Sequence, residues 1–170
     1  MWAVMDFMYQ DTVRSEHPLD LIERLAAFQD WTFNRAEIDE MSVSVSGRWA
    51  DYSIALTWIE DVEALHIACA FDLKIPQTRR AEILSLIAQI NEQLWVGHFD
   101  LWSSENAVIH RQALVLAGGS LPTQIQCETM VRIAIECCER HFQAFQFVVW
   151  AGKSAREALD DALFATEGEA

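Results

Sequence analysis

The densest group of reactive side chains in the sequence lies at positions 135–141, which read IECCERH. Cys137, Cys138 and His141 are of the types that bind zinc or carry out thiol redox chemistry. A structural zinc site usually draws its ligands from two separate pairs, and the sequence offers no second pair. Redox motifs place two residues between their cysteines, whereas Cys137 and Cys138 are adjacent. We therefore expect neither a metal site nor a catalytic thiol here.

The spacing of this segment is instead typical of one side of a long helix. Each helical residue turns the side chain by about 100°, which places Cys127, Cys138 and Phe145 on one apolar stripe. Free cysteines in such a stripe pack as small hydrophobic residues, so we predict buried, unreactive thiols. Glu136 and Arg140 are four positions apart and are predicted to form a salt bridge along the helix.

A second set of polar side chains, His98, Asp100 and His110, lies on two predicted strands. His98 and Asp100 alternate with apolar residues and so share one face of their strand. If His110 lies across from them on the neighbouring strand, the three side chains form a group beside which a small ligand could bind. The alternative is that they are ordinary polar residues on the surface of a hairpin.

The sequence contains no recognisable catalytic or cofactor-binding motif. A nucleophile elbow, a P-loop and a dinucleotide-binding glycine pattern are all missing. No catalytic residue, metal or cofactor is predicted. The chain does hold seven tryptophans, more than a small core needs, which favours a contact surface for a protein partner. The predicted contact residues are Trp49, Trp58, Trp95 and Trp102, with core packing as the alternative for each.

The charge balance excludes several partners. The 170 residues include 26 acidic and 12 basic side chains, for a net charge of −14. No cluster of lysine and arginine is present that could neutralise nucleic-acid phosphates or bind an anionic membrane. The apolar N-terminus lacks a basic region and is interrupted by Asp6, so it is not typical of a signal peptide. We expect a cytoplasmic protein with reduced cysteines and no membrane span.

The periodicity of apolar residues predicts an α+β fold with a mainly antiparallel, five-stranded sheet. The predicted order is helix, three strands, helix, two strands, long helix and a short final helix. Gly47 and Arg48 are predicted to form a two-residue turn. The expected helix boundaries are Pro18 to about Asp30, Thr78 to Gly97, Thr123 to about Trp150, and Ser154 onward. The expected division is an N-terminal arm (1–16), one domain (17–165) and a frayed tail (166–170).

Several segments resemble the YbjN family of bacterial sensory transduction regulators, and most closely its alphaproteobacterial members. They are LDLIERLAA, WADYSIALTWIEDVEALHIACAFDLKIP, INEQLWVGHFDLW, ALVLAGG and FQFVVWAGKSAREAL. The resemblance covers about residues 17–165. It implies a fold similar to that of type III secretion chaperones, which are acidic cytosolic homodimers that bind segments of client proteins. None of the shared motifs is catalytic, so no catalytic residue carries over.

These observations together predict a non-enzymatic regulator or chaperone-like adaptor that forms a homodimer and binds a protein client. The alternative is a domain that senses a small molecule beside His98, Asp100 and His110. An enzyme is the third hypothesis.

Overall fold

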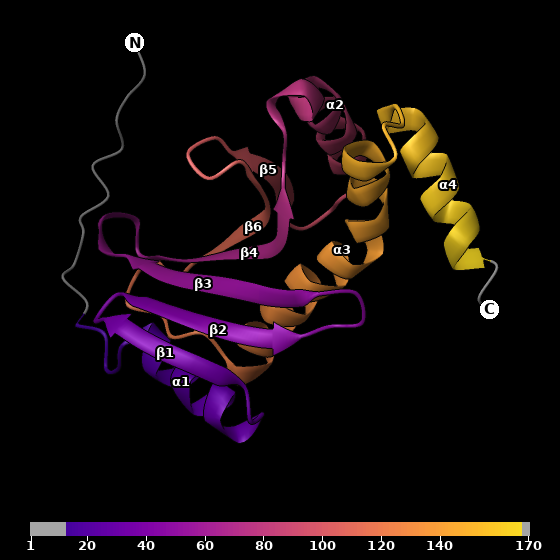
Figure 1. Cartoon of the computed structure of the whole chain (residues 1–170). Coiled ribbons are helices and arrows are strands. Elements are labelled where there is room, and N and C mark those ends of the chain that lie inside the picture. Colours follow the sequence, from indigo (N-terminus) through magenta and orange to yellow (C-terminus); the bar gives the residue numbers. More distant parts are fainter. Residues whose placement is uncertain (1–12, 168–170) are drawn as a thin grey trace, which may run out of the picture.

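The computed structural model describes residues 13–167, which form four α-helices, two short 3-10 turns and one six-stranded sheet (Figure 1). Residues 1–12 of the predicted N-terminal arm and 168–170 of the predicted tail lie outside the described residues. The elements are, in chain order, α1 (Pro18–Phe28), β1 (Thr32–Glu37), β2 (Glu40–Ser46), β3 (Asp51–Ile59), η1 (Glu60–Val62), β4 (Ala64–Lys74), η2 (Gln77–Arg79), α2 (Arg80–Asn91), β5 (His98–Trp102), β6 (Ala107–Val115), α3 (Gln124–Trp150) and α4 (Ala155–Glu167).

The strands are ordered β1-β2-β3-β4-β6-β5, and every neighbouring pair is antiparallel. The predicted α+β class is confirmed, but the predicted number of five strands is wrong because β1 was not expected. A half-buried strand is recognised by apolar residues at alternate positions. In β1 that alternation is broken, because Arg35 occupies an inward position opposite the buried Met41.

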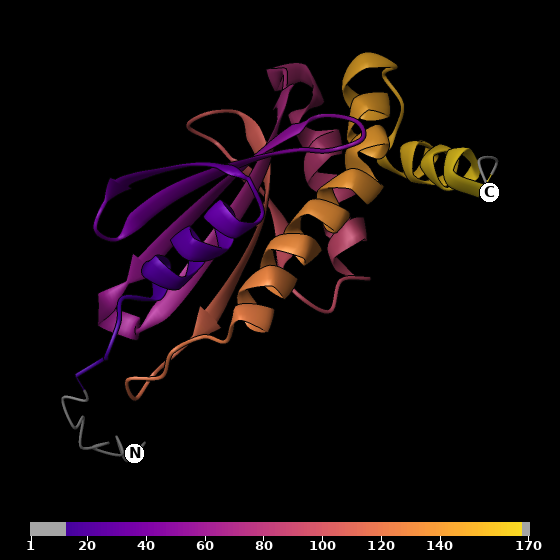
Figure 2. The same cartoon turned by 90° about the horizontal axis from the view of Figure 1, so that it is seen from below.

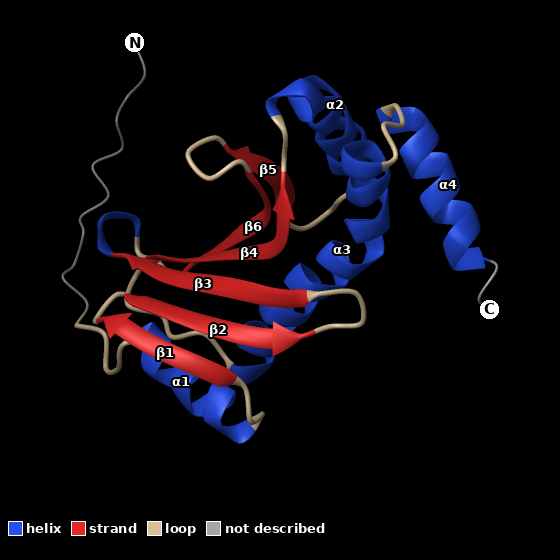
Figure 3. Cartoon of the chain, in the orientation of Figure 1, coloured by secondary structure: helices blue, strands red, loops and turns tan. Residues whose placement is uncertain are grey.

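The helices gather on one side of the sheet. Figures 1 and 2 show α1 and α3 against one face of the sheet, with α2 and α4 at the end of α3. The opposite face carries no helix among the described elements (Figure 3). The apolar stripes of α1 and α3 pack on the inward residues of the strands and form the core. Its largest fully buried side chains include Tyr52, Phe99, Phe145, Ile54, Leu56, Leu65 and Ile67.

The start of α3 agrees with the sequence, whereas three other local predictions are wrong: the cap of α2, the end of α2 and the turn at Gly47. The hydroxyl of Thr123 accepts from the amide of Gln126 at 3.1 Å, and the Gln126 side chain accepts from the Thr123 amide at 2.8 Å. Thr78 does not cap α2, because it lies within η2 and the capping position falls on Arg79. Helix α2 ends at Asn91, six residues before the expected stop at Gly97. The turn at Gly47 has four residues, closed by its amide on the carbonyl of Ala50 at 2.9 Å.

Hydrogen bonds and an ion pair hold the start of helix α4 in place. The carboxylate of Glu82 in α2 accepts from the amide of Ala155 at 2.9 Å. Ser154 and Glu157 form a reciprocal cap, with bonds of 3.0 and 3.3 Å between backbone amides and side chains. Lys153, just before α4, pairs with Asp161 about two turns into the helix. These contacts fix the direction in which α4 leaves the body (Figure 1).

Candidate functional site

The candidate site lies on the outer face of the sheet, which we define as the face opposite α1 and α3. Side chains of a strand alternate between the two faces, and residues directly paired across strands share a face. The register therefore lines up one row of small residues across three strands, in which Ser42 pairs with Ala55 and Ala55 pairs with Ala68. The parallel row holds Ser44, Ser53 and Ala70. Because these side chains are short, the surface at the centre of the outer face lies close to the strand backbone.

Two residues in the middle of this face are buried although no helix covers them. Ala68 is 6% exposed and Ile109 is 2% exposed. Ala68 pairs with Arg111 of β6, and Ile109 pairs with Asp100 of β5. The charged partners lie close enough to help shield these apolar residues from solvent. The outer face thus has a strip of small side chains over β2, β3 and β4, bordered by charged groups over β5 and β6.

A polar group stands beside that strip. Nε of Arg111 lies 3.2 Å from Nε2 of His66, and Nη1 lies 3.5 Å from Oδ2 of Asp100. His98 pairs with Arg111 across β5 and β6 and so shares this face. Partial burial, helped by Arg111 and His98, lowers the pKa of His66. His66 is therefore neutral near pH 7 and accepts a hydrogen bond from the Arg111 guanidinium.

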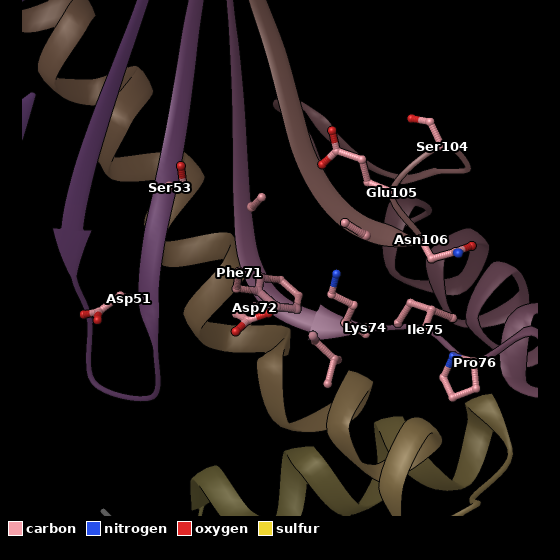
Figure 4. A pocket seen from close by; sticks show the side chains of 13 residues that line it. Asp51, Ser53, Phe71, Asp72, Lys74, Ile75, Pro76, Ser104, Glu105 and Asn106 are labelled. Carbon is pink, nitrogen blue, oxygen red and sulfur yellow. The ribbon is translucent and has the colours of Figure 1, made fainter. Parts of the chain in front are cut away.

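A hollow of about 870 Å³ opens at one end of the outer face (Figure 4). Its walls are β3, the end of β4 and the turn between β5 and β6. Three carboxylates line it, from Asp51, Asp72 and Glu105, together with one ammonium group, from Lys74. Figure 4 shows Asp51 on one wall and Glu105 on the other. The hollow is therefore net acidic, which favours a ligand segment of opposite charge.

The structure does not bring together the three residues of the predicted ligand group. His98 and Asp100 share the outer face, but His110 pairs with Phe99 and points into the core, where it is fully buried. The expected grouping of His110 with His98 and Asp100 is wrong. Neither ring nitrogen of His110 makes a hydrogen bond of normal geometry, although the Val96 carbonyl is near. Burial lowers the pKa of His110 to about 4.

The predicted tryptophan surface is divided among separate elements. Trp95, in the loop before β5, is 99% exposed, and Trp102 at the end of β5 is 48% exposed. Trp49 in the β2–β3 turn is 38% exposed and stacks with the Arg48 guanidinium at 4.7 Å. Trp58 is buried in the core, so the expectation that it contacts a partner is wrong. The roles of the other three stay predictions.

The cysteines are buried, as predicted. All four are free and buried, and the Cys138 thiol lies 3.9 Å from the carbonyl of Cys69. Burial raises the pKa of Cys127 to about 11, which makes its thiolate scarce at neutral pH. Nδ1 of His141 donates to the Cys137 carbonyl at 2.8 Å. In residues 13–167, no three His, Cys, Asp or Glu side chains are grouped to hold a metal ion.

One predicted surface contact of α3 is replaced by another. Glu136 pairs with Arg132, one turn earlier, at 3.2 Å. The expected salt bridge from Glu136 to Arg140 is wrong, since the Glu136 carboxylate is turned toward Arg132 instead.

Within residues 13–167, no helix is long and apolar enough to cross a membrane.

A family model named YbjN, described as "Putative bacterial sensory transduction regulator", matches residues 18–147. The chain belongs to the YbjN family. A similar solved structure is that of YbjN from E. coli, which carries the description "a putative transcription regulator". It has a TM-score of 0.51 and 11% sequence identity, covering 70% of this chain and 84% of that chain. This likeness shows the fold alone. Among curated proteins, none matches the chain.

The outer face of this YbjN-family chain lies wholly within the matched residues, whereas α4 lies beyond them. Two residues of the polar group, His66 and Arg111, were not singled out from the sequence. The signal for Arg111 was the register of the β5–β6 hairpin, whereas His66 comes from β4. A turn over residues 103–106 pairs Trp102 with Ala107 and, by the same count, His98 with Arg111. His110 is then opposite Phe99 and cannot join His98.

Proposed function

We propose that this YbjN-family chain is a non-enzymatic regulator or chaperone-like adaptor that binds a basic segment of another protein across the outer face of its sheet. The observation that carries the proposal is the strip of small side chains on the helix-free outer face, with the exposed Ala55 at its centre and charged groups along its border. Small side chains allow the backbone of a bound segment to approach closely. The family description as a sensory transduction regulator supports a regulatory role.

The charge of the protein supports a basic partner. The chain has a net charge of −14, and the hollow at the end of the outer face holds three carboxylates against one ammonium group. Lysine or arginine side chains of a partner would lie against Asp51, Asp72 and Glu105. Complementary charge of this kind increases the rate of association and fixes the register of the complex.

The free edge of β1 is a poorer place for a partner than the outer face. A bulge between Arg35 and Glu37 interrupts the pairing of β1 with β2. Nε of Arg35 donates to the carbonyls of Glu37 and Ile38 at 3.0 and 3.1 Å, which occupies backbone acceptors at the strand end. Binding by strand addition needs such groups free. We therefore place the partner segment on the face, as a helix or an extended strip.

Ala55 and Ala88 offer a matched pair of variants for the test. Ala55 is exposed at the centre of the outer face, and Ala88 is exposed on α2. A photoreactive residue at position 53, used in living cells, identifies the partner that contacts this face. We expect Ala55→Arg to weaken binding of that partner by at least about tenfold, because the long cation blocks the strip and repels a basic segment. Ala88→Arg adds the same charge elsewhere and should leave the affinity unchanged.

The proposal fails if Ala55→Arg binds the partner as tightly as the parent protein does. Cross-linking of position 53 to a second copy of the chain would assign the face to a dimer contact instead. The homodimer implied by the family resemblance stays a proposal. Light scattering of the purified protein tests it by the mass in solution, which for a dimer is twice that of one chain. The expected cytoplasmic location accords with four free, buried cysteines.

A further inference from the structure

A second pocket lies away from the outer face, where α2, α3 and α4 meet. It has a volume of about 420 Å³, within the range of small-molecule sites. Figure 3 shows the three helices at the same end of the molecule, and each contacts the other two. The apolar part of the wall includes Leu94, Ala144 and Leu159. This wall could accommodate the carbon skeleton of a ligand.

Two arginines line this pocket without a partner. Arg140 comes from α3 and Arg156 from the first turn of α4. Neither makes an ion pair or hydrogen bond with any residue that the structure describes. Most other arginines of this chain do have a partner. Five others are each paired with a carboxylate: Arg14, Arg24, Arg35, Arg111 and Arg132.

The excess of acidic groups makes the unpaired state of these two guanidiniums informative. The sequence has more than two acidic side chains for each basic one, 26 against 12. One carboxylate, that of Asp160, lines the same pocket, so the two arginines leave a net positive charge there. Guanidinium groups bind carboxylate and phosphate oxygens through paired, planar hydrogen bonds. The charge of the pocket is thus opposite to that of the protein as a whole.

The backbone of Arg156 is held in place before any ligand arrives. Helix α4 is held at its start by the bond from the Ala155 amide to Glu82 and by the cap between Ser154 and Glu157. Arg156 follows Ala155 directly, so its backbone is anchored to α2. A site whose elements are already ordered loses less entropy on binding.

We propose that the pocket between α2, α3 and α4 binds a small ligand that carries an oxyanion, a carboxylate or a phosphate, on an apolar body. Arg140 and Arg156 hold the oxyanion, and Leu94, Ala144 and Leu159 contact the body. This inference goes beyond the proposed function and does not depend on it. A regulator with both sites would bind a metabolite at one end and a protein segment on its outer face.

The inference is tested with phenyl phosphate, benzoate, inorganic phosphate and benzylamine as probes. Isothermal titration calorimetry on the full chain should show binding of phenyl phosphate or benzoate, and the stronger of the two identifies the preferred oxyanion. Inorganic phosphate lacks the apolar body and should bind more weakly. Benzylamine carries the opposite charge and should not bind. If neither aromatic anion binds at millimolar concentration, or if benzylamine binds equally well, the proposal is wrong.

The variants Arg140→Gln and Arg156→Gln should each weaken binding of the aromatic anion by about tenfold or more, since each removes one charged bond to it. Arg132→Gln is the matched control, because Arg132 lies on the same helix but pairs with Glu136 outside the pocket. An equal loss in all three variants would indicate a general charge effect and overturn the inference. Unchanged thermal unfolding without probe would show that the variants fold.

The ring of His141 gives a second readout, because it lines the pocket. Its imidazole resonances should shift when the aromatic anion is added. Those of His17, which caps α1 by accepting from the Leu19 amide, should not shift. A shift of His17 without one of His141 would place the anion at another site and contradict the proposal.

Discussion

The carboxylate of Glu82 on α2 accepts a hydrogen bond of 2.9 Å from the backbone amide of Ala155 at the start of α4. The first amides of a helix have no partner within the helix, so a side chain from elsewhere must satisfy them. Here that side chain comes from a helix far earlier in the sequence. The bond joins the C-terminal helix, which lies outside the family match, to an element inside it.

Replacement of Glu82 by alanine should loosen α4 without unfolding the domain. The lost cap is expected to cost about 1 kcal/mol, local to α4. Hydrogen exchange of the α4 amides should then be faster by about fivefold, while exchange in α3 is unchanged. Glu92→Ala is the control, since Glu92 is an exposed residue at the end of the same helix. Equal exchange rates in the Glu82 variant and the parent protein would contradict the role of this bond.

Gly97→Ala should destabilise the protein more than Gly118→Ala. Both glycines have positive φ, +70° and +82°, so both variants carry a backbone cost of about 1 kcal/mol. At Gly97 an added Cβ would also meet Cε1 of His110 at 2.5 Å and the Arg111 carbonyl at 2.9 Å. At Gly118 it would meet nothing within 4 Å. Urea unfolding should show an additional loss of about 1–3 kcal/mol for Gly97→Ala. Equal losses would mean that the ring of His110 moves aside freely.

Buried His110 should make stability depend on pH. Its folded-state pKa is about 4, below the ordinary histidine value of 6.5, chiefly because burial disfavours the charged ring. Between these two values the unfolded chain binds a proton that the folded chain does not. The contribution of neutral His110 is therefore full above pH 6.5 and is lost as the pH falls toward 4.

The variant His110→Leu removes this titration. From pH 7 to pH 5 the free energy of unfolding of the parent protein should fall by roughly 1–2 kcal/mol more than that of the variant. His66 and His141, whose pKa values are also lowered mainly by burial, act in the same direction but are present in both proteins. Parallel pH profiles of the two proteins would show that His110 takes up its proton in the folded state.

The four cysteines should resist modification in the folded protein. Three of them are fully buried, and Cys137 is 9% exposed. Burial raises the pKa of Cys127 and Cys137, and that of Cys138 is raised chiefly by its contact with Cys69, so few thiolates form. A disulfide reagent at pH 8 should react slowly until denaturant is added, with Cys137 modified first. Rapid reaction of a thiol in the folded protein would contradict this packing.

The sequence determines much of the fold, because alternation and helical spacing are strong along most of the chain. The strand His98–Trp102 and the capping box of Thr123 and Gln126 agree with the structure. β1 was missed for a physical reason. An inward arginine replaces the apolar residue that alternation requires, and its charge is satisfied by Asp20 and Glu23 of α1, which are remote in sequence.

The candidate site was harder to predict than the fold. Whether His110 lies beside His98 depends on hairpin register, and a shift of one residue moves a side chain to the other face. The paired state of Arg111 depends on β4, which supplies His66. The pocket near Arg140 depends on how α4 docks against α2 and α3, and periodicity within one helix does not specify that docking.

The inward-pointing Arg35 has a consequence for how the protein behaves at high concentration. Exposed edge strands tend to pair with one another and start ordered aggregates. Arg35 lies beneath the end of β1 and is only 18% exposed, bound to Asp20 and Glu23. A neighbouring chain that added a strand here would have to compete with Arg35 for the carbonyls of Glu37 and Ile38 and accommodate the bulge beside them. β1 therefore resists fibril growth from this edge.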